Sequence, residues 1–310
     1  MPSQEPQTES PRLTPEDIAS MSPRDCARLA AQLLQRVPNK SSVNLMERRA
    51  AELPDPLAID LRDRLQRSVQ MDYSAHEIEL VMDTKWERWR AASAAREPWT
   101  IRWIEQYLRP GDVLFDVGAN VGAYALVAAK SSAGEVTTFA FEPGFATFAA
   151  LCRNIVLNDC QASVVPMAIA LGDKTSLSSF NYRVLEAGAA GHGMADRLPA
   201  PLPGEAAATQ YEQPMPVFRL DDLIRSLTLP NPNHLKIDVD AMELEVLKGA
   251  ERTLAHSDLR SVLIEIDNSL REEAHALLRS AGLRTKETYE VTANDGSLAN
   301  YGYALFVRAP

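Results

Sequence analysis

Residues 113–122 constrain the fold of this chain more than any other segment. They read Val-Leu-Phe-Asp-Val-Gly-Ala-Asn-Val-Gly, an apolar run of strand length that leads into an acid and then into glycines at 118 and 122. Glycine lets a backbone approach a ligand where a Cβ would collide, and a helix that follows presents free N–H groups at the same place. The pattern predicts a buried strand, a tight turn and a helix that together bind a nucleotide-type cofactor.

The glycine spacing separates two classes of cofactor. A dinucleotide fingerprint requires G-x-G-x-x-G, and residues 118–123 lack its second and third glycines. The D-x-G-x-x-x-G pattern of Asp116, Gly118 and Gly122 instead favours S-adenosylmethionine, whose methionine part carries no phosphate. A nucleotide-dependent oxidoreductase would share the fold, and it is the less favoured alternative.

Beyond Gly111, predicted strands alternate with predicted helices, which is typical of a mostly parallel sheet with helices on both faces. We expect strands at 112–117, 135–141, 162–166, 234–239 and 261–266, helices near 121–131, 145–157, 242–254 and 270–281, and a closing hairpin at 284–290 and 301–308. The predicted fold class is α/β, a Rossmann-like sheet with helices on both faces, preceded by a helical N-terminal extension.

The chain divides into three predicted parts. Residues 1–12 are polar and contain prolines, so we expect a disordered tail. Residues 13–95 read as a helical extension, with helices from Thr14, over about 57–69 and over about 75–95. Residues 96–310 form the Rossmann-like domain, in which 186–216 is rich in Ala, Gly and Pro and is predicted to be an irregular insert or lid.

A second acid follows the next predicted strand. Glu142 ends Phe139-Ala140-Phe141 and lies 26 positions after Asp116. In a βαβ unit, a carboxylate at the tip of the second strand can accept both ribose hydroxyls. The alternative is a surface glutamate in front of the helix after Pro143. The glycine turn one strand earlier favours the ribose interpretation.

Charged residues also interrupt the predicted strand at 234–239. Lys236 and Asp238 share one face of it, and burial in a doubly covered sheet requires that each has a partner, such as the other or a ligand. Asp238 and Asp240 stand at its carboxyl end, where open α/β sheets bind ligands. Asp240 could instead cap the next helix. Glu265, which ends a further strand, is either an acid of the substrate pocket or a solvent-facing strand terminus.

Together these motifs resemble the FkbM family of S-adenosylmethionine-dependent methyltransferases. The resemblance covers about Gly111 to Val307 and rests on residues 115–122, 141–143, 219–223, 235–240, 245–250 and 263–265. It implies a Rossmann-like methyltransferase fold and methyl transfer, often to a hydroxyl of a sugar, glycolipid or polyketide-type acceptor. Residues before about 95 carry none of the family motifs.

One departure from the family pattern concerns Ala241, which stands where the family usually has glycine. If this position needs a positive φ, alanine is strained there by about 1 kcal/mol or more. The orientation of Asp240 then differs from the family, and a non-catalytic scaffold that keeps the cofactor pocket becomes an alternative function.

The sequence predicts a role for each candidate residue. Asp238 or Asp240 would position or deprotonate the acceptor, and His192 in the irregular segment is a further candidate base whose alternative is a solvated loop histidine. The cofactor would be held at its methionine end by Asp116, Gly118, Asn120 and Gly122 and at its ribose by Glu142.

Composition bounds the partners. A net charge of −10 argues against a nucleic-acid substrate, and no apolar run reaches the roughly 20 residues of a membrane span. Three scattered cysteines and a start without signal-peptide features predict a cytoplasmic protein. We expect a small-molecule or glycan acceptor, with the N-terminal helices as a candidate homo-oligomer contact. No metal site is predicted, although a magnesium ion on Asp238, Asp240 and Glu265 is an alternative.

Overall fold

The computed structural model describes residues 55, 59, 66–194, 209–292 and 297–308. The chain divides into two compact units, Met1–Leu65 and Gln66–Pro310. The expected tail at 1–12 and the expected helix from Thr14 lie outside the described residues, as does most of the expected helix at 57–69. Those expectations therefore stay predictions. The strands and helices with described bounds run from Ser68 to Arg308 and belong to the second unit.

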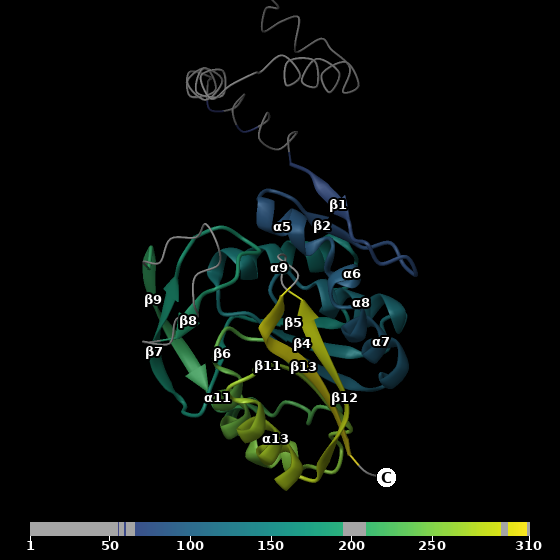
Figure 1. Cartoon of the computed structure of the whole chain (residues 1–310). Coiled ribbons are helices and arrows are strands. Elements are labelled where there is room, and N and C mark those ends of the chain that lie inside the picture. Colours follow the sequence, from purple (N-terminus) through teal and green to yellow (C-terminus); the bar gives the residue numbers. More distant parts are fainter. Residues whose placement is uncertain (1–54, 56–58, 60–65, 195–208, 293–296, 309–310) are drawn as a thin grey trace, which may run out of the picture. The chain divides into compact units, whose positions relative to one another are not determined.

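A seven-stranded sheet forms the centre of this unit (Figure 1). Its order is β12-β13-β11-β10-β3-β4-β5; the five strands from β11 to β5 run parallel, and β13 and β12 add antiparallel to β11. The predicted strands and the closing hairpin are confirmed. Their bounds are β3 Val113–Val117, β4 Thr137–Phe141, β5 Val164–Met167, β10 His234–Ile237, β11 Ser261–Asp267, β12 Leu283–Thr292 and β13 Leu298–Arg308.

Helices cover both faces of the sheet. Neighbouring side chains of a strand point to opposite faces, and because both sets are apolar here, each face needs a layer of helices to bury it. Leu114 of β3 packs into one core cluster with residues of α7 and α8, whereas Phe115 packs into a second with residues of α11 and α13. Figure 1 shows these two pairs of helices on opposite sides of the sheet. The helices are α7 Pro98–Tyr107, α8 Ala123–Ser131 and α9 Phe145–Leu157, then α10 Leu220–Leu227, α11 Glu243–Gly249, α12 Glu251–Ala255 and α13 Arg271–Ser280.

A second, four-stranded sheet was not expected from the sequence. Its order is β6-β9-β7-β8, with β6 Ala170–Leu171, β7 Ser176–Tyr182, β8 Gly193–Met194 and β9 Tyr211–Phe218. Residues 193–194 and 211–216 of the expected irregular segment are therefore strand, while 195–208 lie outside the described residues. The sequence did not predict β9, because it contains prolines at 214 and 216 and proline usually argues against a strand. Met215 and Val217 alternate with them and are buried.

The expected helix over 75–95 is wrong in its first half. Residues Ser68–Gln70 (β1) and Glu79–Val81 (β2) form an antiparallel pair, and α5 Lys85–Arg90 and α6 Ser93–Arg96 follow. Ile78 and Leu80 are both fully buried, which is the period of two of a strand. The side-chain amide oxygens of Asn154 on α9 and of Asn158, the residue that follows α9, accept hydrogen bonds from the β2 backbone N–H groups of Val81 and Glu79 at 2.7 and 2.9 Å. The described end of the N-terminal extension is thus built into this unit.

Candidate cofactor and acceptor site

The glycine turn after β3 docks onto the end of β4. The N–H groups of Gly118 and Ala119 donate to the carbonyl of Phe141 at 3.0 and 2.9 Å. Gly118 has φ +84°, and a Cβ on it would lie 1.9 Å from the carbonyl oxygen of Asp238. Gly122 has φ +88°, and a Cβ on it would lie 2.5 Å from Cδ1 of the Leu151 side chain. Both positions therefore require the residue that the sequence places there.

Glu142 is brought against this turn, as the sequence predicted for neighbouring parallel strands. Its Oε2 accepts from the Asn120 backbone N–H at 3.0 Å and its Oε1 from that of Gly144 at 2.7 Å. Burial raises the pKa of Glu142 to about 7 despite these two donors. The alternative of a surface glutamate is wrong, because only 7% of the residue is exposed.

Asp116 is a buried carboxylate without a hydrogen-bond partner among the described residues. Lys236 Nζ, the nearest cation, is 3.9 Å from its Oδ1. Burial raises the pKa of Asp116 to about 6, and the Lys236 charge opposes that shift. Such a group is costly unless something compensates it, so the end of β3 is suited to a positively charged ligand.

The predicted contact between Lys236 and Asp238 is confirmed. Lys236 Nζ donates to Asp238 Oδ2 at 2.6 Å and lies 5.0 Å from the centroid of the Tyr124 ring. The Asp238 side chain is about one quarter exposed, and the Tyr303 hydroxyl lies 3.5 Å from its Oδ2. One oxygen of Asp238 is therefore fixed while the carboxylate still faces the open side of the strand end.

Asp240 does not cap helix α11, so that alternative is wrong. The residue before the helix is Met242, which makes no side-chain cap. Asp240 Oδ2 instead accepts from the Gly191 N–H at 2.8 Å. Ala241 has φ +60°, so the position does adopt the left-handed conformation in which alanine is strained by about 1 kcal/mol or more.

Residues 187–193, which we call segment 187–193, lie directly on the predicted cofactor residues. Asn120 Nδ2 donates to the carbonyl of Ala189 at 3.0 Å. From the other side, α5 holds the segment, because Arg90 Nε donates to the Gly188 carbonyl at 3.0 Å and Thr84 Oγ1 to that of Ala187 at 2.8 Å. One short segment thus links the glycine turn, the end of β10 and the N-terminal helices.

Comparison with known proteins decides the family. Residues 116–289 match the family model described as the methyltransferase FkbM domain. The chain belongs to the FkbM methyltransferase family. It is therefore an S-adenosylmethionine-dependent methyltransferase with the α/β fold described above, as the sequence resemblance predicted.

Two named relatives, both methyltransferases, agree with this assignment. Hexuronic acid methyltransferase AglP of Haloferax volcanii is 28% identical over 206 residues, which cover 65% of this chain and 76% of AglP. The 31-O-demethyl-FK506 methyltransferase FkbM of Streptomyces tacrolimicus is 34% identical over 201 residues, 56% of this chain and 74% of that protein. A solved structure, that of an S-adenosylmethionine-dependent methyltransferase from Agrobacterium tumefaciens, has 9% sequence identity to this chain and a TM-score of 0.43. The likeness covers 79% of this chain and 72% of the other protein's chain.

His192 of this FkbM-family methyltransferase is buried, so the alternative of a solvated loop histidine is wrong. Its ring packs against those of Phe180 and Tyr182, at centroid distances of 5.8 and 5.3 Å. Burial, with the positive charges of Arg183 and Arg90, lowers the pKa of His192 to about 4. The imidazole is therefore neutral and a weak base at neutral pH.

Sequence reasoning missed Glu97, which lies outside the family motifs at the start of α7. Glu97 is buried, and burial raises its pKa, as does the negative charge of Asp238. Its position before Pro98 signals only a helix start. Glu265, a candidate from the sequence, pairs in register with Tyr303 on the neighbouring strand, and burial raises its pKa well above the usual range.

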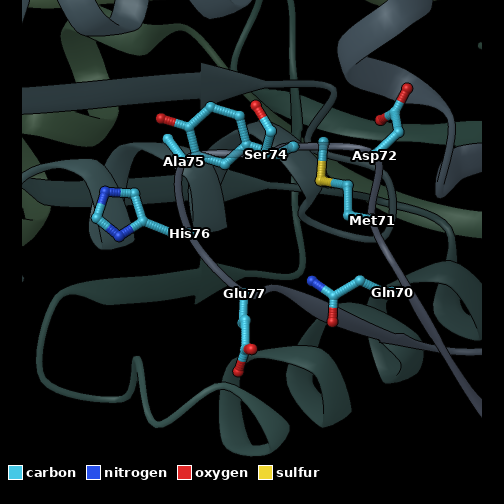
Figure 2. Close-up of a pocket in the computed structure, with 8 residues that line it drawn as sticks. Gln70, Met71, Asp72, Ser74, Ala75, His76 and Glu77 are labelled. Carbon is cyan, nitrogen blue, oxygen red and sulfur yellow. The ribbon is translucent and has the colours of Figure 1, made fainter.

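Two open cavities lie in the described part of the enzyme. One of about 360 Å³ is lined by Phe145, Leu185, Tyr211 and Gln213. Of these residues, Phe145 lies three positions after Glu142 in the sequence. The other, of about 500 Å³, lies in the loop from Gln70 to Glu77 (Figure 2). Two of its side chains are already engaged, because Asp72 accepts from the backbone of Ala94 and Ala95, and the Tyr73 hydroxyl donates to Glu105.

The described residues include no group of three or more His, Cys, Asp or Glu side chains placed to hold a metal ion. The magnesium alternative on Asp238, Asp240 and Glu265 therefore finds no support in this arrangement. Within the same part of the chain, no helix combines the length and the apolar character needed to cross a membrane.

Proposed function

We propose that this enzyme methylates a hydroxyl of a sugar, glycolipid or polyketide-type small molecule. The relatives support this acceptor class, since one is named for a hexuronic acid and the other for 31-O-demethyl-FK506. The observation that carries the site is the contact at 3.0 Å between the Glu142 carboxylate and the Asn120 backbone N–H. It brings the acid after β4 onto the glycine turn after β3, which is the geometry needed to hold an adenosyl cofactor across two strand ends.

The residues at this edge fit S-adenosylmethionine. When bound, this cofactor supplies an electrophilic methyl group on a positively charged sulfur. In our proposal, Glu142 accepts bonds from the ribose hydroxyls, since each carboxylate oxygen has a lone pair beyond the one used by the protein. The buried Asp116, whose oxygens accept no hydrogen bond from the described residues, suits the cationic methionine end, which is held by Asp116, Gly118, Asn120 and Gly122.

Asp238 is our candidate for positioning and deprotonating the acceptor hydroxyl. Lys236 holds one of its oxygens at 2.6 Å, and the carboxylate is partly open at the strand end. Orientation of an acceptor in line with the methyl group can contribute roughly 7–11 kcal/mol, and removal of its proton adds to this. Asp240 and His192 would assist by holding segment 187–193, because Asp240 accepts a bond from that segment.

The ribose assignment is tested by calorimetric titration of Glu142→Ala with S-adenosylhomocysteine. We expect affinity to fall about tenfold or more, because two hydroxyls lose a charged acceptor. Glu135→Ala is the matched control, since Glu135 is exposed at the opposite end of β4. Unchanged affinity in the Glu142 variant would remove the assignment.

Methyl transfer is tested with labelled S-adenosylmethionine and a panel of uronic acids, glycolipids and macrolide alcohols. Incorporation into a hydroxyl that Asp238→Asn abolishes supports the proposal. The alternative is a non-catalytic scaffold, favoured only by the strained Ala241. It predicts that S-adenosylhomocysteine binds while no member of the panel is labelled, even with Ala241→Gly.

A further inference from the structure

Arg96 stands out in the described structure as a cation held in place without an anion. Its guanidinium carbon lies 3.2 Å from the centroid of the Trp89 ring, so the group rests on the face of the indole. Its Nη1 is buried and has no hydrogen-bond partner among the described residues. A planar guanidinium that stacks through its face keeps its in-plane N–H donors for another group.

The acid next to it in sequence does not fill this role. Glu97 Oε2 accepts from the Thr100 hydroxyl at 3.1 Å, and the Glu97 side chain also bonds that of Tyr124. Within residues 66–194, 209–292 and 297–308, no carboxylate comes within ion-pair distance of Arg96. A charged donor atom left buried without a partner is costly, so the buried Nη1 of Arg96 calls for an anion from outside the described residues.

Neighbouring residues connect Arg96 to the proposed reaction site. Trp99 lies three positions after Arg96, its ring is 5.2 Å from that of Tyr303, and the Tyr303 hydroxyl reaches Asp238 Oδ2 at 3.5 Å. Arg90 also acts on Arg96, and its own Nε is already bonded to Gly188. Arg90 and Arg96 repel each other, and a negative charge between them would lower the electrostatic energy of the pair.

The charge of the neighbourhood selects the kind of anion. The negative charges of Asp238, Glu265 and Glu97 all act on Tyr303, so a phosphate dianion would meet strong repulsion there. A carboxylate carries a single charge and matches the fork of a guanidinium with two parallel bonds. Trp99 adds a second buried donor without a described partner, its Nε1, and its ring lies 5.2 Å from that of Tyr303.

We propose that Arg96 binds a carboxylate in the reaction site, either that of the methionine part of the cofactor or that of an acidic sugar used as acceptor. This inference rests on the proposed function, and it assigns a ligand-binding role to a helix that precedes the family domain at 116–289. Arg96 fixes the position of the carboxylate, while Asp238 acts on the reacting hydroxyl.

The test compares ligands that differ only in this acid. Calorimetry on the full chain measures S-adenosylhomocysteine against its decarboxylated aminopropyl analogue. Tryptophan fluorescence then measures D-glucuronate against D-glucose with S-adenosylhomocysteine present. We expect the acid to bind about tenfold or more tightly in one of the two pairs. Equal affinity within both pairs would overturn the inference without any substitution.

Variants then assign the source of the carboxylate. Arg96→Gln should erase the preference for the acid, Arg96→Lys should restore part of it, and Arg88→Gln, exposed on the same N-terminal helices, should leave it unchanged. Loss confined to the first pair identifies the cofactor, and loss confined to the second identifies an acidic acceptor. A preference that survives Arg96→Gln overturns the role of Arg96. Failure of the wild-type chain to bind S-adenosylhomocysteine at all would instead remove the proposed function.

Discussion

At the scale of single residues, Gly118 is the position where the site has least freedom. It combines φ +84° with a backbone neighbour, the Asp238 carbonyl, that a Cβ would meet at 1.9 Å. We expect Gly118→Ala to force the turn away from the end of β10 and to abolish binding of S-adenosylhomocysteine. It should also lower the free energy of unfolding by more than the about 1 kcal/mol of a left-handed alanine.

Gly134 supplies the control for this prediction. It has a similar φ of +82°, but no atom lies within 4 Å of where its Cβ would be. Gly134→Ala should therefore show the conformational cost alone, about 1 kcal/mol in urea unfolding, with cofactor affinity intact. If the two variants lose the same stability and bind equally well, the close approach at Gly118 is not what holds the turn.

Glu142 makes the site sensitive to pH. Burial raises its pKa to about 7 in the folded protein, against about 4.3 in an unfolded chain. Stability from this group is complete below about pH 4 and is lost as pH rises through about 7, because the unfolded state then ionises more readily. Binding of ribose favours the ionised form, so affinity for S-adenosylhomocysteine should instead rise between pH 6 and 8.

Glu142→Gln tests both halves of this expectation. The variant should show a weaker fall in thermal stability between pH 4.5 and 7.5, and its cofactor affinity should lose the rise between pH 6 and 8. Calorimetric titrations at several pH values measure the second effect. An affinity of the wild-type protein that is flat over that range would contradict the assignment.

Residues at strand ends could be predicted from the sequence, because a parallel sheet brings the carboxyl ends of its strands to one edge. Asp116, Glu142 and Asp238 are residues of this kind. Arg96 and Glu97 are not, since they enter the site from helices whose sequence shows only amphipathic spacing and a helix start before Pro98. Their placement depends on long-range packing, which local pattern does not encode.

At the scale of elements, the strands of the central sheet could be predicted from the sequence, whereas those of the four-stranded sheet could not. Buried strands such as β3 and β10 are continuous apolar runs, which are easily recognised. In β9, prolines alternate with the buried Met215 and Val217, so turn signals and strand signals coincide. The β2 strand is only three residues long, which is too short for an alternating pattern to be recognised in its sequence. A side chain of α9, Asn154, accepts one of its backbone hydrogen bonds, and the sequence of β2 does not reveal that contact.

Thr84 links the N-terminal helices to segment 187–193. Its Oγ1 accepts from the Glu87 N–H in a capping box at α5 and donates to the Ala187 carbonyl at 2.8 Å. We expect Thr84→Ala to cost about 1–2 kcal/mol in urea unfolding, since a cap is lost and the Ala187 bond with it. Thr84→Ser keeps the hydroxyl and should recover most of that stability. Equal losses in both variants would show that the methyl group, rather than the hydroxyl, matters.

At the scale of the whole molecule, the methyltransferase unit is larger than its family motifs. The family match begins at residue 116, whereas the compact unit begins at Gln66. Met71, Ile78 and Leu80 belong to the same core cluster as α8 and α9. The sequence placed the domain boundary at residue 95. In the structure, residues as early as Met71 pack into the core of the methyltransferase unit.

Two truncated chains test this boundary. A chain that begins at Gln66 keeps the whole described core, so we expect cooperative unfolding within a few degrees of the full chain and normal binding of S-adenosylhomocysteine. A chain that begins at Ala94 loses Ile78 and Leu80, each fully buried and each worth about 1.5–3 kcal/mol. That loss is a large part of a typical stability of about 5–15 kcal/mol. We therefore expect the shorter chain to aggregate or to melt far below the longer one, whereas matching thermal unfolding curves would show residues 66–93 to be peripheral to the core.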